Sequence, residues 1–287
     1  MRNVLANLAS CLALSAFLFA APAVYGQSSR AESARSYGER GHDWVSKGEW
    51  ERAISDYSLA LSFEPSAPNY YNRALARYYK GDFAPALADL DRALTLDPRL
   101  VKAWIQRGLT RIQTGDVVAA IRDFSEALTL EPKNALAWQN RGCARRIVGD
   151  LDGALDDYTQ ALKHDALNAA AWHNRGEVRQ QLGDLDGALK DYNRALKLDP
   201  QFANAWNSRA SLRLQTDDLA AAGADASQAI LLNASLAEAW LNRGLAYWQQ
   251  GRRVEAERDF TRGLALNPAL KQQLELALKK YRDRERG

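Results

Sequence analysis

The chain has 287 residues, of which 47% are hydrophobic and 25% charged, and its formal net charge is +3. These fractions are those of a folded protein and exclude a largely disordered or collagen-like chain. The 38 Lys and Arg residues nearly balance the 35 Asp and Glu residues, so bulk charge gives no indication of nucleic-acid or anionic-lipid binding. Two cysteines, Cys11 and Cys143, are too few for a disulfide framework.

The first residues have the features of a secretory signal. Arg2 gives a short basic start, and the uncharged run from Cys11 to Val24 has the length of a signal-peptide core. Small residues fit cleavage after Ala23 or Gly26. We therefore expect a cleaved signal peptide over residues 1–26 and a periplasmic or secreted mature protein without stable membrane insertion. An uncleaved membrane anchor is the alternative, because the uncharged span is nearly long enough to cross a bilayer.

From residue 34 onward the sequence repeats with a period of 34 residues. One aromatic residue, here called the anchor, recurs in seven repeats, with one residue missing between the first two: Tyr37, Tyr70, Trp104, Trp138, Trp172, Trp206 and Trp240. A small residue follows each anchor after four positions: Gly41, Ala74, Gly108, Gly142, Gly176, Ala210 and Gly244. We therefore expect a short lead over residues 27–33 and seven repeats over residues 34–66, 67–100, 101–134, 135–168, 169–202, 203–236 and 237–270.

Each repeat is expected to form two helices, because apolar and small residues recur at three- and four-residue steps on both sides of a turn. The turn often reads Gly-Asp, as at Gly115 and Asp116. Glycine suits the left-handed end of the first helix, and aspartate is a good cap for the second. A proline such as Pro132 then ends the second helix. One hairpin leaves its apolar face exposed, so the seven hairpins are expected to stack over a continuous core.

This pattern resembles the tetratricopeptide repeat family. The matching residues of the third repeat are Trp104, Gly108, Gly115, Ala120, Phe124, Ala127 and Pro132. The resemblance covers all seven repeats, and it implies an all-α fold: a right-handed α-solenoid whose concave groove binds segments of partner proteins. Residues 271–287, with Leu274 and Leu278 on one side and charged residues elsewhere, are expected to form a solvated capping helix.

Charged residues also recur in register. Arginine lies three residues after each anchor: Arg40, Arg73, Arg107, Arg141, Arg175, Arg209 and Arg243. Aspartate recurs in each second helix: Asp56, Asp89, Asp123, Asp157, Asp191, Asp225 and Asp259. A second arginine follows the first by one turn: Arg77, Arg111, Arg145, Arg179 and Arg213. A basic ladder for acidic ligands or nucleic acid is one interpretation. The matched numbers favour a structural ladder of Arg–Asp pairs, with the arginines stacked on the anchor rings.

By the same resemblance, first-helix residues one, five, eight and nine positions after each anchor line the groove. The expected partner-binding residues are Tyr71, Leu75, Tyr78, Ile105, Leu109, Ile112, Gln139, Arg146, His173, Glu177, Gln180, Asn207, Leu241, Leu245 and Trp248. They are apolar or aromatic at both ends of the array and polar between them, which suits an amphipathic helix or an extended segment. Ordinary helix packing, or contact with a second copy of the chain, is the alternative explanation for the apolar members.

The sixth repeat departs from the pattern. It has Ala210 and Asp217 at glycine positions, Gly223 at an aliphatic position, Ala226 at an aromatic position and Ala234 at the proline position. A glycine inside a helix costs about 1 kcal/mol relative to alanine, and the missing side chains remove packing. We expect this repeat to be locally the least stable and a candidate for a bend.

An enzyme is the alternative from another class of function. No phosphate-binding glycine loop, G-x-S-x-G motif or H-E-x-x-H motif occurs. His173 and Glu177 form an i, i+4 pair, which supplies too few ligands for a metal site. Arginines next to Cys143 would lower the pKa of its thiol, although a role as a small groove residue is the simpler interpretation.

The sequence therefore predicts a non-catalytic scaffold, without cofactor or metal, that binds partner proteins and not nucleic acid outside the cytoplasm. A membrane-anchored assembly factor and an enzyme that uses His42 or His173 are the alternatives, and self-association stays open. Some members of the family hold a partner's C-terminal carboxylate with lysines and asparagines. No repeat here has a lysine one residue after the anchor together with an asparagine five residues after it, and Lys102 is an isolated candidate.

Overall fold

The computed structural model describes residues 29–286, and every regular element in that range is a helix. The expected signal over residues 1–26, with its alternative of an anchor, lies outside the described residues. Most of the expected lead over residues 27–33 is part of a first helix, which runs over residues 29–46. Within the described range, no helix has the length and apolarity needed to span a membrane.

The chain forms two compact units, divided after Pro132. The first unit continues from helix 29–46 with α2 (Trp50–Phe63), α3 (Ala67–Lys80), α4 (Phe83–Leu96), α5 (Val101–Gln113) and α6 (Val117–Leu130). The second unit contains α7 (Ala135–Ile147), α8 (Leu151–His164), α9 (Ala169–Gln181), α10 (Leu185–Leu198), α11 (Ala203–Gln215), α12 (Leu219–Leu232), α13 (Ala237–Gln249), α14 (Arg253–Leu266), the short 3-10 helix η1 (Pro268–Leu270) and α15 (Lys271–Arg286).

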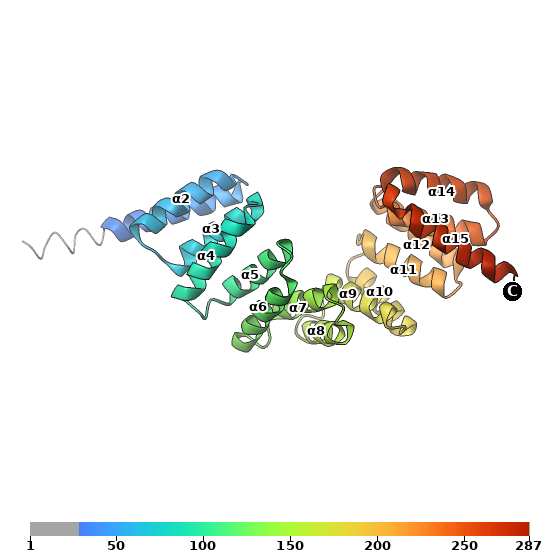
Figure 1. The fold of residues 1–287 in the computed structure, drawn as a ribbon, viewed down its shortest axis with the longest axis horizontal. Helices are drawn as coiled ribbons and strands as arrows, with labels where there is room; N and C mark the ends of the chain where they lie inside the picture. The colour runs from blue at the N-terminus through green and yellow to red at the C-terminus, as the bar shows by residue number, and fades with distance from the viewer. Residues whose placement is uncertain (1–28, 287) are drawn as a thin grey trace, which may run out of the picture. The chain divides into compact units, whose positions relative to one another are not determined.

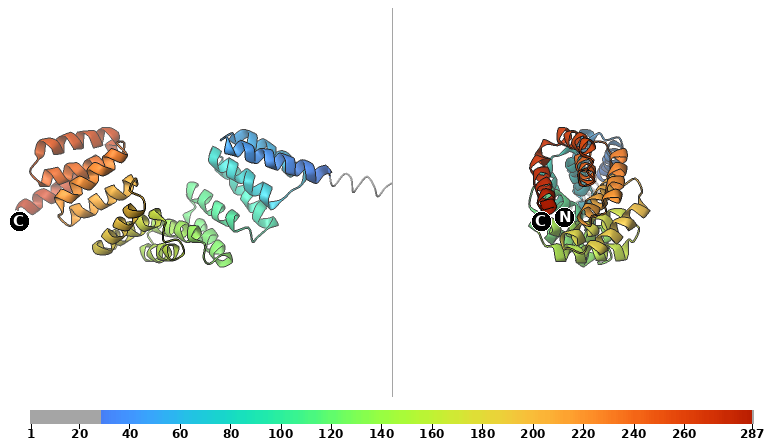
Figure 2. Two further views of the ribbon diagram at one scale, coloured as in Figure 1. Left: turned by 180° about the vertical axis from the view of Figure 1, so that it is seen from behind. Right: turned by 90° about the vertical axis from the view of Figure 1, so that its right-hand side faces the viewer.

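Within each unit, successive helices pack as hairpins, and each hairpin packs against the next (Figures 1 and 2). The first helix of a hairpin contains the anchor, and the second contains the recurring aspartate. The all-α architecture of consecutive helix pairs, expected from the 34-residue period, is therefore confirmed.

The hairpin turns have the expected geometry, with one exception. Gly115 has φ +85°, in the left-handed region that glycine adopts without a steric penalty, and the equivalent glycines of the other repeats are also left-handed. Asp217 occupies this position in the sixth repeat and has φ +63°. The side chain of Asp116 accepts a hydrogen bond from the backbone N–H of Ala119 and so caps α6. Asp82 makes no such bond and pairs with Lys80 instead, so a turn aspartate does not always cap the helix that follows it.

Proline is not required to end the second helices. Helices α8 and α12 end at the same repeat position as the others, although alanine replaces the proline in both repeats. In each repeat the residue after the helix is an extended Asp, Glu or Asn. In the fifth to seventh repeats, an anchor indole then bonds the carbonyl at the proline position: Trp172 to Ala166 (2.9 Å), Trp206 to Pro200 (2.9 Å) and Trp240 to Ala234 (3.0 Å). Trp104 makes the same bond to Pro98 (2.8 Å), so the bond forms with alanine and proline alike and does not depend on the proline ring.

In the five repeats that have glycine four residues after the anchor, this glycine faces an aromatic ring of the second helix. A Cβ atom at Gly176 would lie 2.7 Å from the Tyr192 ring, and Gly108 and Gly244 face Phe124 and Phe260 at 2.6 Å. In the sixth repeat the pair is Ala210 and Ala226, both fully buried. The loss of the ring in this repeat is thus matched by a larger residue opposite it, which partly offsets the irregularity seen in the sequence.

The capping helix adopts the expected polarity. Leu274 is buried in a cluster with Leu241, Leu245 and Phe260, and Leu278 packs against the same cluster. Leu274 lies 34 residues after the last anchor, so α15 occupies the register of an eighth first helix. It packs against α13 in the second unit.

Candidate functional site

The seven expected Arg–Asp pairs all form, each within one hairpin. In the fifth repeat, Nε and Nη2 of Arg175 donate to the two carboxylate oxygens of Asp191 at 2.8 Å each, while Arg179 donates a third bond at 2.8 Å. The bidentate pairs of the other repeats are Arg40–Asp56, Arg73–Asp89, Arg107–Asp123, Arg141–Asp157, Arg209–Asp225 and Arg243–Asp259. In the first repeat the indole of Trp44 donates to Asp56 in place of the second arginine.

The anchor rings hold the arginines in place. The guanidinium of Arg175 lies 4.7 Å from the centre of the Trp172 ring, and every repeat has the same stacking between its first arginine and its anchor. Arginine is suited to this position because its planar group stacks on a ring while its edge forms a fork with a carboxylate. The first arginine of each repeat is therefore held along its edge by the aspartate and on its face by the anchor ring.

The same arginines also join neighbouring repeats, a feature that the sequence analysis missed. Nη1 of Arg107 lies 2.7 Å from the carboxylate of Asp91, and Nη1 of Arg209 donates to Asn193 at 2.6 Å. Asp91 and Asn193 lie two residues after the recurring aspartate of the preceding repeat, where polar residues recur. The arginines and aspartates are thus committed to the fold, and we call them, with the anchors, the framework ladder.

The expected groove residues of the first unit lie on α3 and α5. Ile105 is buried and presents little surface, whereas Leu75, Leu109 and Ile112 are half-buried. The ring of Tyr71 is contacted by Nζ of Lys102 at 4.5 Å, so this isolated lysine has an intramolecular partner.

Tyr78 belongs to an aromatic cluster of the first unit. Its ring packs edge-to-face against Tyr79 and Phe83, with 5.6 Å between the ring centres in each case. Tyr79, which is more exposed, also stacks on Trp50. Tyr78 therefore packs much of its ring surface against residues of its own unit.

Several expected groove residues of the second unit are engaged with neighbouring side chains. Gln139 accepts a hydrogen bond from Asn168 at 2.8 Å. His173 is buried, its Nε2 atom lies 3.0 Å from Ser208 Oγ, and burial lowers the pKa of its imidazole. Arg146 lies 3.8 Å from Glu177.

Trp248 is an intramolecular packing residue. Its ring contacts Phe260, and the guanidinium of Arg253 lies 3.7 Å from its centre. The ring is half-buried as a result. Of the two explanations that the sequence leaves open for Trp248, packing is the one that these contacts support.

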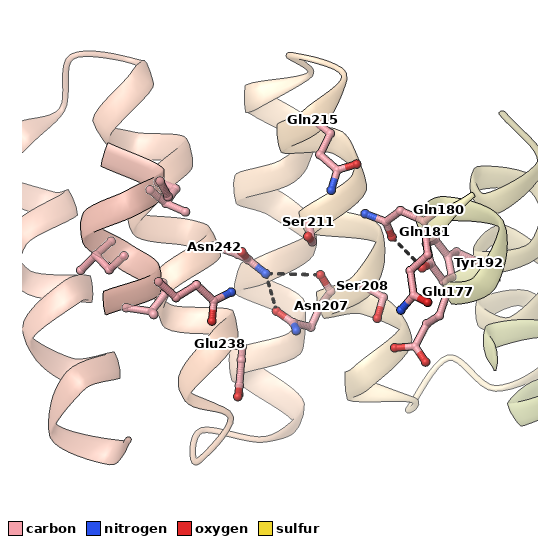
Figure 3. A pocket seen from close by; sticks show the side chains of 15 residues that line it. Glu177, Gln180, Gln181, Tyr192, Asn207, Ser208, Ser211, Gln215, Glu238 and Asn242 are labelled. Atoms are coloured by element: carbon pink, nitrogen blue, oxygen red, sulfur yellow. Dashed lines mark hydrogen bonds between the residues drawn. The ribbon is translucent and has the colours of Figure 1, made fainter. Parts of the chain in front are cut away.

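The remaining expected residues meet in one hollow of about 390 Å³ within the second unit. It lies between the first helices α9, α11 and α13 and the capping helix α15, and Tyr192 of α10 reaches it from behind. We call it the α9–α15 hollow. Its lining residues are Glu177, Gln180, Gln181, Tyr192, Asn207, Ser208, Ser211, Gln215, Glu238, Leu241, Asn242, Leu245, Gln273, Leu274 and Ala277 (Figure 3).

The hollow combines an apolar floor with polar walls that carry two carboxylates, Glu177 and Glu238. Leu241, Leu245 and Leu274 belong to the buried apolar cluster beneath it. In the polar wall, Nδ2 of Asn242 donates to Oδ1 of Asn207 at 2.8 Å, which fixes both amides (Figure 3). Nδ2 of Asn207 and Oδ1 of Asn242 then have no partner among the described residues.

Most of the other polar groups of the hollow are available to a ligand. Gln180 accepts a hydrogen bond from the hydroxyl of Tyr192 at 2.8 Å. Gln181, Ser211 and Gln215 make no side-chain hydrogen bond within the described residues, and the two glutamines are exposed. A ligand in the hollow would therefore meet hydrogen-bonding groups that need not break internal bonds first.

Sequence reasoning found eight of these residues and missed others. The groove positions taken from the family predict eight lining residues: Glu177, Gln180, Gln181, Asn207, Ser211, Gln215, Leu241 and Leu245. They leave out the residues that α15 supplies, and also Ser208, Glu238 and Asn242. The signal for α15 was present in the 34-residue register of Leu274, which continues the anchor column beyond the seventh repeat.

The catalytic candidates lie in unfavourable environments. Burial raises the pKa of the Cys143 thiol, against the expectation that neighbouring arginines lower it, because desolvation outweighs the charge of Arg146. The imidazole of His42 lies within hydrogen-bonding distance of Tyr57 and Asn72, at 3.1 and 3.3 Å. Within the described range, no group of three or more His, Cys, Asp or Glu residues is placed to hold a metal ion.

Comparison with known proteins agrees with this architecture. Family models described as tetratricopeptide repeat match residues 80–135, 169–202 and 237–270. A human protein named tetratricopeptide repeat protein 4 is 34% identical over 80 residues, which is 26% of this chain and 21% of that protein. The chain thus spans about a fifth of the length of this relative.

Solved structures with lower identity share the fold. A tetratricopeptide repeat protein from Parabacteroides merdae aligns with a TM-score of 0.68 and 20% identity, covering 86% of this chain and 99% of that one. The structure titled as pilF from Pseudomonas aeruginosa aligns with a TM-score of 0.65 and 18% identity, covering 74% and 96%.

The period, the hairpins and these matches lead to one conclusion. Proteins built from such repeats generally act in protein–protein interaction, and the repeat stack is typically a non-catalytic scaffold. The chain carries tetratricopeptide repeats and has the fold of tetratricopeptide repeat proteins.

Proposed function

We propose that the protein is a non-catalytic interaction scaffold that binds segments of partner proteins in the α9–α15 hollow. The observation that carries this proposal is the hollow itself, which combines an apolar floor with hydrogen-bonding groups that have no internal partner. A pocket with these two properties gains affinity from apolar burial and orientation from its few polar contacts. The framework ladder takes no part in binding, because its charges are already paired.

The candidate catalytic groups support the non-catalytic part of the proposal. The half-buried thiol of Cys143, with its raised pKa, carries little thiolate at neutral pH, and the imidazole of His173, with its lowered pKa, stays neutral there.

We also propose that the protein works outside the cytoplasm, on the basis of the signal features of residues 1–26. The mass of the purified native protein tests this part: loss of the first 23 or 26 residues supports export with cleavage, whereas a full-length chain in the membrane fraction supports the anchored alternative.

Site-specific photo-crosslinking tests the binding surface. The photoreactive residue would replace Gln181 or Gln215, which are exposed in the hollow, with Arg262 on α14 as the control position. We expect the two hollow positions to capture the same protein or proteins and the control position to capture none of them.

A second arm ties capture to the hollow. Replacing both Asn207 and Asn242 by alanine should abolish capture by the probe at position 215. If capture persists, or if the control position captures the same products, the hollow is not the binding surface. Capture of a second copy of the chain would indicate self-association.

A further inference from the structure

The charges of the α9–α15 hollow have one sign. Its lining contains two carboxylates, Glu177 and Glu238, and no lysine, arginine or histidine. The rest of the lining is uncharged, so the carboxylates determine which charge a ligand must bring.

The two carboxylates differ in how far the chain neutralises them. Glu177 lies 3.8 Å from Arg146 and 3.8 Å from His173. Burial lowers the pKa of His173, so this imidazole is neutral at pH 7 and only Arg146 offsets the charge of Glu177. Among the side chains that the structure describes, none forms an ion pair with Glu238. The hollow therefore keeps a net negative charge that is centred on Glu238.

The carboxylates also share one edge of the hollow. Figure 3 shows Glu177 and Glu238 on either side of Asn207, while Gln215 lies at the opposite edge. Leu241, Leu245 and Leu274 make the apolar floor of the same hollow.

The polar groups favour an extended ligand over a helical one. A helix satisfies its own backbone N–H and C=O groups and so has little use for neutral amides, whereas an extended segment leaves alternate backbone groups open on each side. The free donor of Asn207 and the free acceptor of Asn242 match those two kinds of group. Gln181, Ser211 and Gln215 add further partners along the same wall.

We infer that the α9–α15 hollow selects an extended segment of a partner protein that carries a lysine or arginine next to a bulky aliphatic residue. The aliphatic side chain packs on the leucine floor, and the basic side chain points to the edge formed by Glu177 and Glu238. This inference rests on the proposed function of the hollow and adds the chemistry of the partner. The sequence leaves open whether the ligand is a helix or an extended segment, and the inference selects the extended segment.

Selection of peptides from a random library tests the inference without knowledge of the natural partner. A phage-displayed library of random dodecapeptides would be selected on the purified protein, and the enriched peptides would be measured by fluorescence polarisation. We expect enrichment of Lys or Arg within two residues of Leu, Ile or Met. Replacing that basic residue by glutamine should raise the Kd at least about fivefold at low salt and less at 0.5 M salt.

Variants of the protein assign the charge to its source. Glu238→Gln should weaken the selected peptides about as much as loss of their basic residue does, and Glu238→Lys should abolish their binding. Glu275→Gln is the matched control, because Glu275 is an exposed glutamate of α15 that does not line the hollow. It should leave the Kd unchanged.

The outcomes separate the inference from the proposed function. The inference alone is overturned if the selected peptides bind in the hollow but lack a basic residue, or if they bind the Glu238→Lys variant equally well. Binding in the hollow is judged by the loss of binding when Asn207 and Asn242 are replaced. No enrichment, or peptides insensitive to the Asn207 and Asn242 substitutions, counts against both.

A peptide of the chain's own residues 279–287 provides one more arm. It contains five basic and two acidic residues, a net charge of +3, and no aliphatic residue. We expect it to compete poorly. Competition as strong as that of the selected peptides would identify a second copy of the chain as the occupant and would overturn the assignment to a partner protein.

Discussion

The framework ladder and the α9–α15 hollow use the same helices for opposite purposes. In the ladder, the aspartates are buried and paired: Asp191 has an exposed side-chain fraction of 2% and accepts from two arginines. In the hollow, Gln181 and Gln215 are exposed and unpaired. One face of a first helix thus specifies how hairpins stack, and another is left free to vary between repeats. The difference predicts that substitutions in the ladder change stability, whereas substitutions in the hollow change binding.

The largest effect is expected from removing a ladder carboxylate. Asp191→Ala leaves the buried Arg175 without its carboxylate partner and removes the shortest ion pair of Arg179, and loss of one member of a buried ion pair costs about 3–5 kcal/mol. Urea unfolding of the purified variant measures the loss. Lys190→Ala, at the exposed neighbouring position of α10, is the control and should change stability by less than about 0.5 kcal/mol. Equal effects of the two substitutions would show that the ladder contributes no more than surface charge.

A smaller loss of stability is expected from overpacking between the small residue that follows an anchor and the aromatic ring of the second helix. In Gly176→Ala the new methyl group lies 2.7 Å from the Tyr192 ring, and such overpacking costs about 1–3 kcal/mol. The same substitution at Gly223 meets its nearest atom, Cβ of Ala246, at 3.7 Å, so Gly223→Ala should instead stabilise α12 by about 0.5–1 kcal/mol. Effects of the same sign at both sites would contradict the paired packing of small and aromatic residues.

The turn of the sixth repeat offers a stabilising change. Asp217 has φ +63°, a conformation that glycine adopts at lower energy, so Asp217→Gly is expected to stabilise the protein by about 0.5–1 kcal/mol. Amide hydrogen exchange gives the local readout. We expect α11 and α12 to exchange faster than α9 and α10 in the wild type and to be slowed by the substitution. Equal protection of the two repeats in the wild type would remove the proposal of a weak sixth repeat.

Stability near the hollow should depend on pH through His173. Burial lowers the folded-state pKa of this imidazole below the unfolded value of about 6.5, so below that pH the unfolded chain binds more protons than the folded one. The stability it contributes at neutral pH is therefore lost as the pH falls from about 6.5 through the folded-state pKa. Melting temperatures between pH 7.5 and 5 should fall less steeply in His173→Gln than in the wild type, and parallel curves would refute this role.

The smallest effects on stability are expected in the hollow itself. Gln215→Ala and Gln181→Ala remove exposed side chains without internal hydrogen bonds, and they should change the free energy of unfolding by less than about 0.5 kcal/mol. Losses above about 1 kcal/mol would show that these residues serve the fold and not a ligand.

The sequence predicted the ladder better than the hollow, for a physical reason. Each Arg–Asp pair lies within one hairpin and is repeated seven times, so a 34-residue alignment of the chain with itself reveals it. The hollow depends on how side chains from four first helices meet, and Glu238 and Asn242 enter it from positions that are not among the expected groove positions. Exposure was equally hidden: Ile105 and His173 occupy expected groove positions, yet contacts with neighbouring helices bury them.

Filling the hollow while leaving the ladder intact tests the central claim most directly. Ser211 lines the hollow, so Ser211→Trp would occupy it, and Ser62→Trp at an exposed position of α2 is the matched control. Crosslinking from position 215 would be measured in both backgrounds, together with the melting temperature. We predict that Ser211→Trp abolishes capture, that Ser62→Trp does not, and that both variants melt within about 3 °C of the wild type. Undiminished capture in a folded Ser211→Trp variant would contradict the assignment of binding to the α9–α15 hollow.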